Sequence, residues 1–221
     1  MQIIDDVHGF FWDSRTQNNC NSYLIDGPTR ILIDPGHLNL FGHVKQGLDA
    51  LKIGLEDIGL VLCTHAHPDH MEAVELFKDM PNLFTLHEMD WELVKSMLGQ
   101  LGLSARDRLE AVRPDFFLKE GDFAVDGLDF KIFYTPGHSP GGICLYWPDK
   151  RVLFTGDLIF KEGLGRTDLP GGNGDQLKAS IQRLTDLDID YILPGHGDII
   201  SGAQEVRRNF EEIENYWFRY V

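Results

Sequence analysis

The feature that most constrains this chain is a run of ligand-type side chains at a strand-to-helix corner. Within "LCTHAHPDHMEAVELF" (62–77), three histidines and one aspartate fall within six residues: His65, His67, Asp69 and His70. The apolar run "IGLVLCT" (58–64) before them predicts a buried strand. The amphipathic run after them (70–80) predicts a helix that ends at Pro81. Because a buried strand holds the loop that follows it in a fixed position, such a corner is typical of a functional loop.

The residue types of this corner are those of a metal site. His65 and His67 are two residues apart, so in an extended loop they point to the same side. Neutral imidazole is the commonest metal ligand, and Zn²⁺ prefers N, O and S donors. One metal cannot easily take all four groups from so short a loop, whereas two adjacent metals could share them. The alternative is a set of surface histidines, with Asp69 capping the helix.

Three further ligand-type residues stand at corners that leave a strand. His138 lies in "TPGHSPGG", Asp157 in "LFTGDLIF" and His196 in "LPGHGD". Glycine beside each of them lets the backbone approach a metal closely. Asp157 alone would be interpreted as a turn cap, but together with the two histidines it favours a metal role. Asp34, at the end of another strand, could orient the His loop through a hydrogen bond.

The remaining pattern predicts an α/β fold. Strand pairs are expected in 20–36, 123–137 and 141–157, and single strands in 82–87 and 190–198. Helices are expected in 43–53, 88–112, 175–187 and 203–221. This order predicts two mixed halves packed as an α/β sandwich. We expect one domain over 1–221, with a C-terminal helix at about 203–221.

The charge and the termini restrict the partners. The net charge is -15, which disfavours nucleic acid and anionic membranes because both need clustered Lys and Arg. No apolar stretch approaches the roughly 20 residues of a membrane span, and the first residues do not resemble a signal peptide. Three cysteines at unrelated spacings give no disulfide framework. We therefore expect a cytoplasmic monomer or homodimer that acts on a small molecule.

Four motifs together resemble the metallo-β-lactamase superfamily: T-H-A-H-P-D-H, T-P-G-H-S-P-G-G, T-G-D and P-G-H-G. The resemblance covers roughly residues 3 to 200. It implies a four-layer αβ/βα sandwich with two divalent metals at one edge of its sheets. It also implies a first metal on His65, His67 and His138, and a second on Asp69, His70 and His196, with Asp157 bridging both.

The resemblance implies hydrolysis without a protein nucleophile. Two metals lower the pKa of a water between them and polarise the bond under attack. Asp69 is the expected catalytic residue, because it ligates one metal and orients that water. Cys63 precedes the motif in an apolar strand and is expected to be a buried structural thiol. Zinc is the expected metal, with iron or manganese as alternatives, since His and Asp suit all three.

The segment "GLGRTDLPGGNGDQL" (163–177) indicates the subgroup. Its G-R-T-D resembles small glyoxalase II-like (hydroxyacylglutathione hydrolase-like) enzymes and also persulfide dioxygenases. The first resemblance implies a thioesterase that acts on a substrate such as a glutathione thioester. Arg166 then binds a substrate carboxylate or pairs with Asp168. The second implies one Fe(II) on His65, His138 and Asp157. A non-enzymatic metal-binding module is a third alternative.

Overall fold

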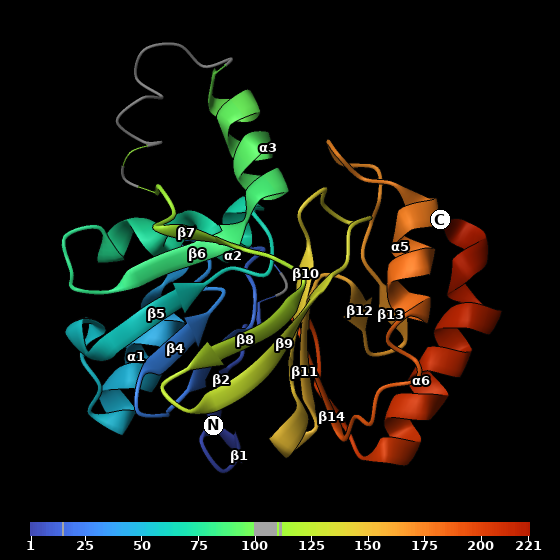
Figure 1. Cartoon of the computed structure of the whole chain (residues 1–221), viewed down its shortest axis with the longest axis horizontal. Coiled ribbons are helices and arrows are strands. Elements are labelled where there is room, and N and C mark those ends of the chain that lie inside the picture. Colours follow the sequence, from blue (N-terminus) through green and yellow to red (C-terminus); the bar gives the residue numbers. More distant parts are fainter. Residues whose placement is uncertain (15, 100–109, 111) are drawn as a thin grey trace. The chain divides into compact units, whose positions relative to one another are not determined.

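The computed structural model describes residues 1–14, 16–99, 110 and 112–221. The chain divides into two compact units, Met1–Leu118 and Lys119–Val221. Each unit contains its own large sheet with helices beside it (Figure 1). The expected α/β class is therefore confirmed, while the single-domain organisation stays a prediction. Within the described residues, no helix is both long and apolar enough to cross a bilayer.

The first unit contains a seven-stranded sheet in which the strands lie in chain order. The strands are β1 (Gln2–Ile4), β2 (Val7–Phe10), β3 (Ser22–Ile25), β4 (Arg30–Ile33), β5 (Ile58–Leu62), β6 (Leu83–His87) and β7 (Phe116–Leu118). Strands β1 to β4 pair antiparallel, and β4 to β7 pair parallel. The C-terminal ends of β4, β5 and β6 therefore meet at one edge, where sites in such sheets form.

Helices α1 (Gly42–Leu51), α2 (Pro68–Met71) and α3 (Glu88–Gly99) belong to the first unit. Three 3₁₀ segments accompany them: Leu38–Leu40, Leu55–Asp57 and Glu72–Phe77. Their apolar side chains form one core with the sheet, and its members include Leu48, Val61, Met71, Phe84 and Val94. Helix α3 confirms the start of the expected 88–112 helix; residues 100–109 and 111 of that prediction lie outside the described part of the chain.

The expected helix over 70–80 is wrong in its type and length. Helix α2 is a single turn, and the 3₁₀ segment Glu72–Phe77 follows it. The backbone of Gly36, just after β4, explains the change. Its N–H donates to the His70 carbonyl oxygen (3.0 Å), and its carbonyl oxygen accepts from the Ala73 N–H (2.8 Å). In an α-helix, the His70 carbonyl and the Ala73 N–H would form hydrogen bonds within the helix. Here both bond to Gly36 instead, so the α-helical pattern does not continue.

The second unit contains a six-stranded sheet in the order β15-β14-β11-β10-β9-β8. These strands are β8 (Gly121–Val125), β9 (Leu128–Tyr134), β10 (Ile143–Trp147), β11 (Val152–Gly156), β14 (Tyr191–Pro194) and β15 (Ile200–Ser201). A separate small ribbon joins β12 (Ile159–Phe160) to β13 (Gly163–Leu164). The expected strand pairs around 123–137 and 141–157 are confirmed.

Two helices pack on this sheet, α5 (Gly174–Gln182) and α6 (Ala203–Asn215), as Figure 1 shows in orange and red. Short 3₁₀ segments lie at Pro148–Lys150 and Trp217–Tyr220. The shared core includes Leu153 and Ile192 from the sheet, Ile181 from α5, and Phe210 and Ile213 from α6. The C-terminal helix thus docks on the core, but it ends at Asn215 and a 3₁₀ turn continues it.

Candidate metal centre

The loop after β5 holds the first ligand cluster, defined as His65, His67, Asp69 and His70. The imidazole centroids of His65 and His67 lie 4.8 Å apart, and those of His65 and His70 lie 4.0 Å apart. His67 is the residue before α2, with extended backbone, and Pro68 begins the helix. That turn places Asp69 and His70 in the first helical positions, both buried. The cluster packs its imidazole groups together, as a metal site requires.

Asp34, which follows β4, holds this loop in place. Its Oδ1 accepts from the Thr64 N–H (2.7 Å), and its Oδ2 accepts from the Thr64 hydroxyl (2.7 Å) and from His70 Nδ1 (2.9 Å). Because a carboxylate only accepts, His70 carries its hydrogen on Nδ1 and presents Nε2 as a ligand atom. The backbone of Asp34 is left-handed (φ 52°), a conformation that Asp tolerates. The structure shows the orienting hydrogen bonds that were considered for Asp34.

Two further residues position the cluster, and the sequence analysis missed both. Asp90 on α3 is buried, and its Oδ2 accepts from the Ala66 N–H (2.7 Å) between the first two histidines. Asn18 donates from Nδ2 to Asp69 Oδ2 (2.6 Å) across 51 residues of chain. Neither residue stands in a motif. A search for polar residues after strand ends would have found Asp90, which follows β6 by three residues.

The second unit holds the second ligand cluster, defined as His138, Asp157 and His196. They follow β9, β11 and β14, three strands that run in the same direction. Asp157 Oδ2 lies 3.5 Å from His138 Nε2 and 3.3 Å from His196 Nε2. One carboxylate oxygen thus faces the Nε2 atoms of two imidazoles, which suits an oxygen shared by two metals.

The loop after β13 fixes the orientation of His138. His138 Nδ1 donates to the carbonyl oxygen of Arg166 (2.7 Å), so Nε2 is the atom with which His138 could bind a metal. Gly165 allows this approach, because a Cβ there would lie 1.9 Å from the Asp157 carbonyl oxygen and 3.1 Å from His138 Nδ1. The glycine of G-R-T-D therefore serves the second ligand cluster directly.

The Arg166 side chain forms a bidentate ion pair with Asp168. Its Nε and Nη2 donate to the two carboxylate oxygens of Asp168, each at 2.6 Å. Both side chains are exposed. The hydrogen bonds from Arg166 lower the pKa of Asp168 to about 2. Of the two roles considered for Arg166, the ion pair is the one seen.

Two buried thiols, Cys63 and Cys144, are poorly suited to act as nucleophiles. Cys63, next to the His loop, is fully buried, and burial raises the pKa of its thiol well above the ordinary value. Burial likewise raises the pKa of Cys144 to about 12. A thiol must ionise to attack or to bind a metal. The expectation that Cys63 is a buried thiol is confirmed.

The donor set fits divalent metals. All seven predicted ligands are among the described His and Asp side chains that could hold a metal ion. In His70 and His138, Nδ1 bonds a carboxylate or a carbonyl, which is the usual arrangement behind a metal-binding Nε2. Nitrogen and oxygen donors without thiolate suit Zn²⁺, Fe²⁺ and Mn²⁺. The ligand set itself stays a prediction, with four members in the first unit and three in the second.

The profile of the Metallo-beta-lactamase superfamily matches residues 15–196. This chain belongs to that superfamily. It is 34% identical to hydroxyacylglutathione hydrolase GloC of Haemophilus influenzae, over 87% of this chain and 92% of that protein. It is also 35% identical to a probable metallo-hydrolase of Methanocaldococcus jannaschii, over 81% of this chain and 88% of that one.

A solved structure agrees with this assignment. The crystal structure of TTHA1623 in a di-iron-bound form is 32% identical, with a TM-score of 0.68, and covers 86% of this chain and 93% of that one. The chain therefore has the α/β sandwich fold of the superfamily and is a metal-dependent hydrolase. The relative from Haemophilus influenzae supports the glyoxalase II-like subgroup that the motifs indicate.

Proposed function

We propose that this protein is a dinuclear thioester hydrolase of the glyoxalase II type. His65, His67 and His138 would hold one metal, Asp69, His70 and His196 the other, and Asp157 both. The observation that carries the proposal is the position of Asp157 Oδ2, 3.3 Å and 3.5 Å from two imidazole nitrogens that belong to different metals in this scheme. Zinc is the proposed metal, and a small cytoplasmic thioester is the proposed substrate.

The metals would supply an activated water and polarise the thioester carbonyl. The residues of the chain supply the geometry. Asn18 donates to Oδ2 of Asp69 and so helps to hold the carboxylate that would orient the attacking water. Asp34 and the Arg166 carbonyl keep His70 and His138 in the tautomer that presents Nε2.

The name of the GloC relative supports a thioester over other acyl substrates. A glutathione thioester is one candidate, and Arg166 is the proposed contact for a substrate carboxylate. That contact competes with the ion pair to Asp168, so it requires the pair to open. The role of Arg166 in substrate binding therefore stays a prediction.

The test is hydrolysis of S-D-lactoylglutathione and of simple thioesters by zinc-loaded protein. Substituting Asp69→Asn should lower kcat by about 100-fold or more, because it removes a group that orients the water. Asp79→Asn is the matched control, since Asp79 is an exposed aspartate ten residues along the chain, and it should leave kcat unchanged. Absence of thioester turnover, with oxygen consumed on glutathione persulfide, would contradict the proposal in favour of the iron dioxygenase.

A further inference from the structure

A cavity of about 210 Å³ lies within the first unit beside the His loop. Its walls come from the His loop with α2, the 3₁₀ segment Glu72–Phe77 and helix α3. His67, a member of the first ligand cluster, forms part of the lining. A group that occupies the cavity is therefore next to a residue proposed to bind the metal.

Most of the cavity wall is apolar. Met71 and Val94 are buried at 5% and 8% exposure, and Met97, one turn along α3 from Val94, is 46% exposed. Methionine is unbranched and adapts its shape, so such walls accept ligands of several lengths. An apolar cavity of roughly 150 Å³ holds benzene, with six carbons. By proportion, this cavity suits an apolar group of roughly eight carbons.

The polar part of the lining is acidic. Glu72 and Glu75 stand on the 3₁₀ segment and face the cavity beside His67. Among the described residues that line it, there is no lysine or arginine. Glu72 Oε2 accepts from the Leu38 N–H (3.3 Å) and contacts His37 Nδ1 (3.0 Å), so Glu75 carries the main negative charge at the cavity. A carboxylate placed there would meet this like charge without a lysine or arginine to offset it, which costs affinity. The cavity therefore selects against an anionic group.

From these observations we infer that the cavity binds the acyl group of the substrate, and that this acyl group is uncharged, apolar and of medium length. The inference rests on the proposed thioester hydrolysis and narrows it. It favours a hexanoyl- or phenylacetyl-like thioester over a short hydroxyacyl or a dicarboxylic one, and it leaves the thiol outside the cavity.

The test compares thioesters of one uncharged thiol, N-acetylcysteamine, that differ only in the acyl group. The kcat/KM for the hexanoyl ester should exceed that for the acetyl ester by about 30-fold, because the added methylenes enter the cavity. The adipoyl ester has the same six carbons but ends in a carboxylate, and it should be about 10-fold poorer than the hexanoyl ester. Changing the thiol at constant acyl group should alter kcat/KM much less.

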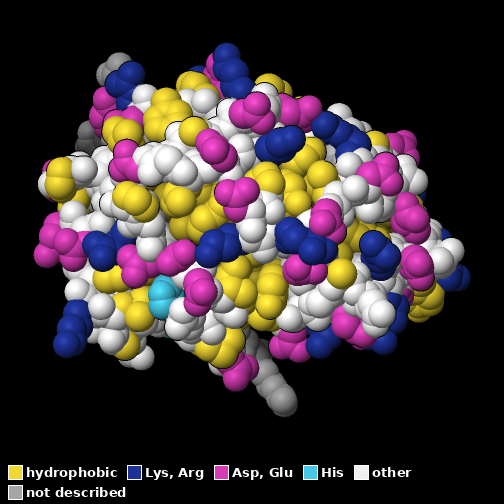
Figure 2. All heavy atoms as spheres, turned by 60° about the horizontal axis from the view of Figure 1, so that its bottom comes forward, with side chains coloured by type: hydrophobic (Ala, Val, Ile, Leu, Met, Phe, Trp, Pro, Cys, Tyr) yellow, Lys and Arg dark blue, Asp and Glu magenta, His cyan; other side chains and the backbone are white. Residues whose placement is uncertain are grey.

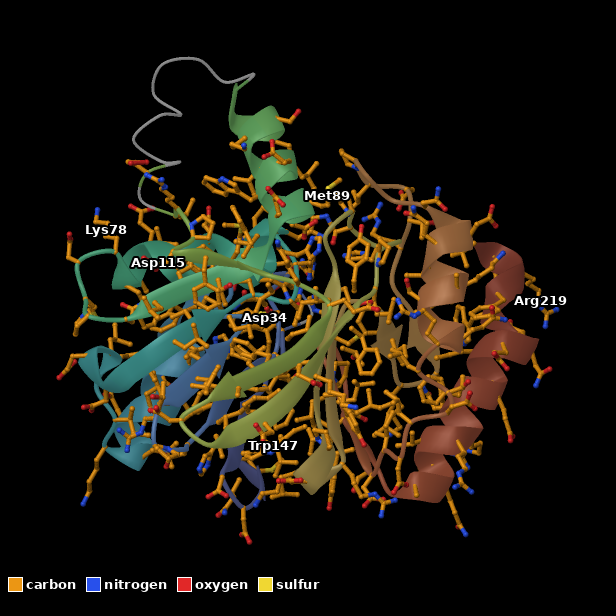
Figure 3. The ribbon with its side chains drawn as sticks, viewed as in Figure 1. Asp34, Lys78, Met89, Asp115, Trp147 and Arg219 are labelled. Atoms are coloured by element: carbon orange, nitrogen blue, oxygen red, sulfur yellow. The ribbon has the colours of Figure 1, made fainter. Side chains whose placement is uncertain are left out.

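Two methionines of α3 provide a matched pair of variants. Met97 lines the cavity, whereas Met89, labelled in Figure 3, does not; their exposures are 46% and 47%. Met97→Glu should lower the hexanoyl-to-acetyl ratio about 10-fold, and Met89→Glu should leave it unchanged. Glu75→Lys should raise the adipoyl-to-hexanoyl ratio about 10-fold, because it places a cation at the cavity.

A binding measurement separates this inference from the proposed function. Metal-free protein should bind the hexyl thioether of N-acetylcysteamine in a calorimetric titration, and Met97→Glu should weaken that binding. Equal rates for all acyl groups, with no effect of Met97→Glu on the ratio, would overturn the cavity assignment and leave thioester hydrolysis standing. If no thioester is hydrolysed, the proposed function fails, and the thioether titration alone decides the cavity.

Discussion

The two ligand clusters are built in different ways. The first takes four side chains from one short loop, and buried carboxylates hold that loop: Asp34 bonds Thr64 and His70, and Asp90 bonds the Ala66 N–H. The second takes three side chains from three loops, and a backbone carbonyl and a glycine hold one of them. The first cluster therefore depends on buried charge, and the second on close backbone packing.

The largest effect is expected from Asp34→Asn. The amide fits the same space and tolerates the same left-handed backbone, but it has one acceptor oxygen for three donors. We expect the free energy of unfolding of the metal-free protein to fall by roughly 3 kcal/mol, measured with urea. Asp126→Asn is the control, because Asp126 is an exposed aspartate with φ 46°. Equal losses for both variants would contradict the anchoring role of Asp34.

A glycine substitution tests the packing of the second cluster. In Gly165→Ala, the new Cβ would overlap the Asp157 carbonyl oxygen, so the loop must move away from His138. We expect a loss of about 2 kcal/mol in stability, together with weaker metal binding in a competition titration. In Gly163→Ala the nearest atom is 3.8 Å away, at Phe160 Cβ, so that variant should match the wild type. Normal metal affinity in Gly165→Ala would contradict the dependence of the second ligand cluster on close backbone packing.

How much of each cluster could be predicted follows from its construction. The candidate ligands between His65 and His70 stand out in the sequence because four such side chains within six residues are unusual. His138, Asp157 and His196 were predicted as ligands from a weaker signal, a glycine-framed corner after a strand. Some residues that position the two clusters could not be predicted, because their hydrogen bonds join loops that are distant in the sequence. The bond from Asn18 to Asp69 is an example. Such contacts depend on the order of the strands in the sheet, which no local sequence pattern predicts.

The same reasoning explains the elements of the fold. Hairpins and apolar strands were predicted because turn residues and continuous apolar runs are local signals. The helix over 70–80 was wrong because Gly36, more than 30 residues earlier, takes its backbone hydrogen bonds. Strand β7 gave no signal, since three residues carry too little periodicity.

On the face drawn in Figure 2, basic side chains are scattered among acidic ones, a distribution that the net charge alone does not give.

The smallest effect is expected for the exposed ion pair between Arg166 and Asp168. The pKa of Asp168 is lowered to about 2 by the hydrogen bonds from Arg166. A lowered carboxyl pKa contributes stability above the unfolded value of roughly 3.9, and that contribution is lost as the pH falls toward about 2. A carbon-detected NMR titration should show this low midpoint, and Arg166→Gln should move it back up. An unchanged midpoint in Arg166→Gln would show that the ion pair does not lower the pKa of Asp168.

The most direct test of the central claim is the metal content per chain of protein produced with zinc, iron and manganese all supplied. If both ligand clusters serve a dinuclear hydrolase, the wild type should carry about two metals per chain. His196→Ala should then reduce that number to about one, because His196 serves only the second metal in this scheme. About one iron per chain in the wild type, unchanged in His196→Ala, would contradict the dinuclear site and favour the oxygen-dependent alternative.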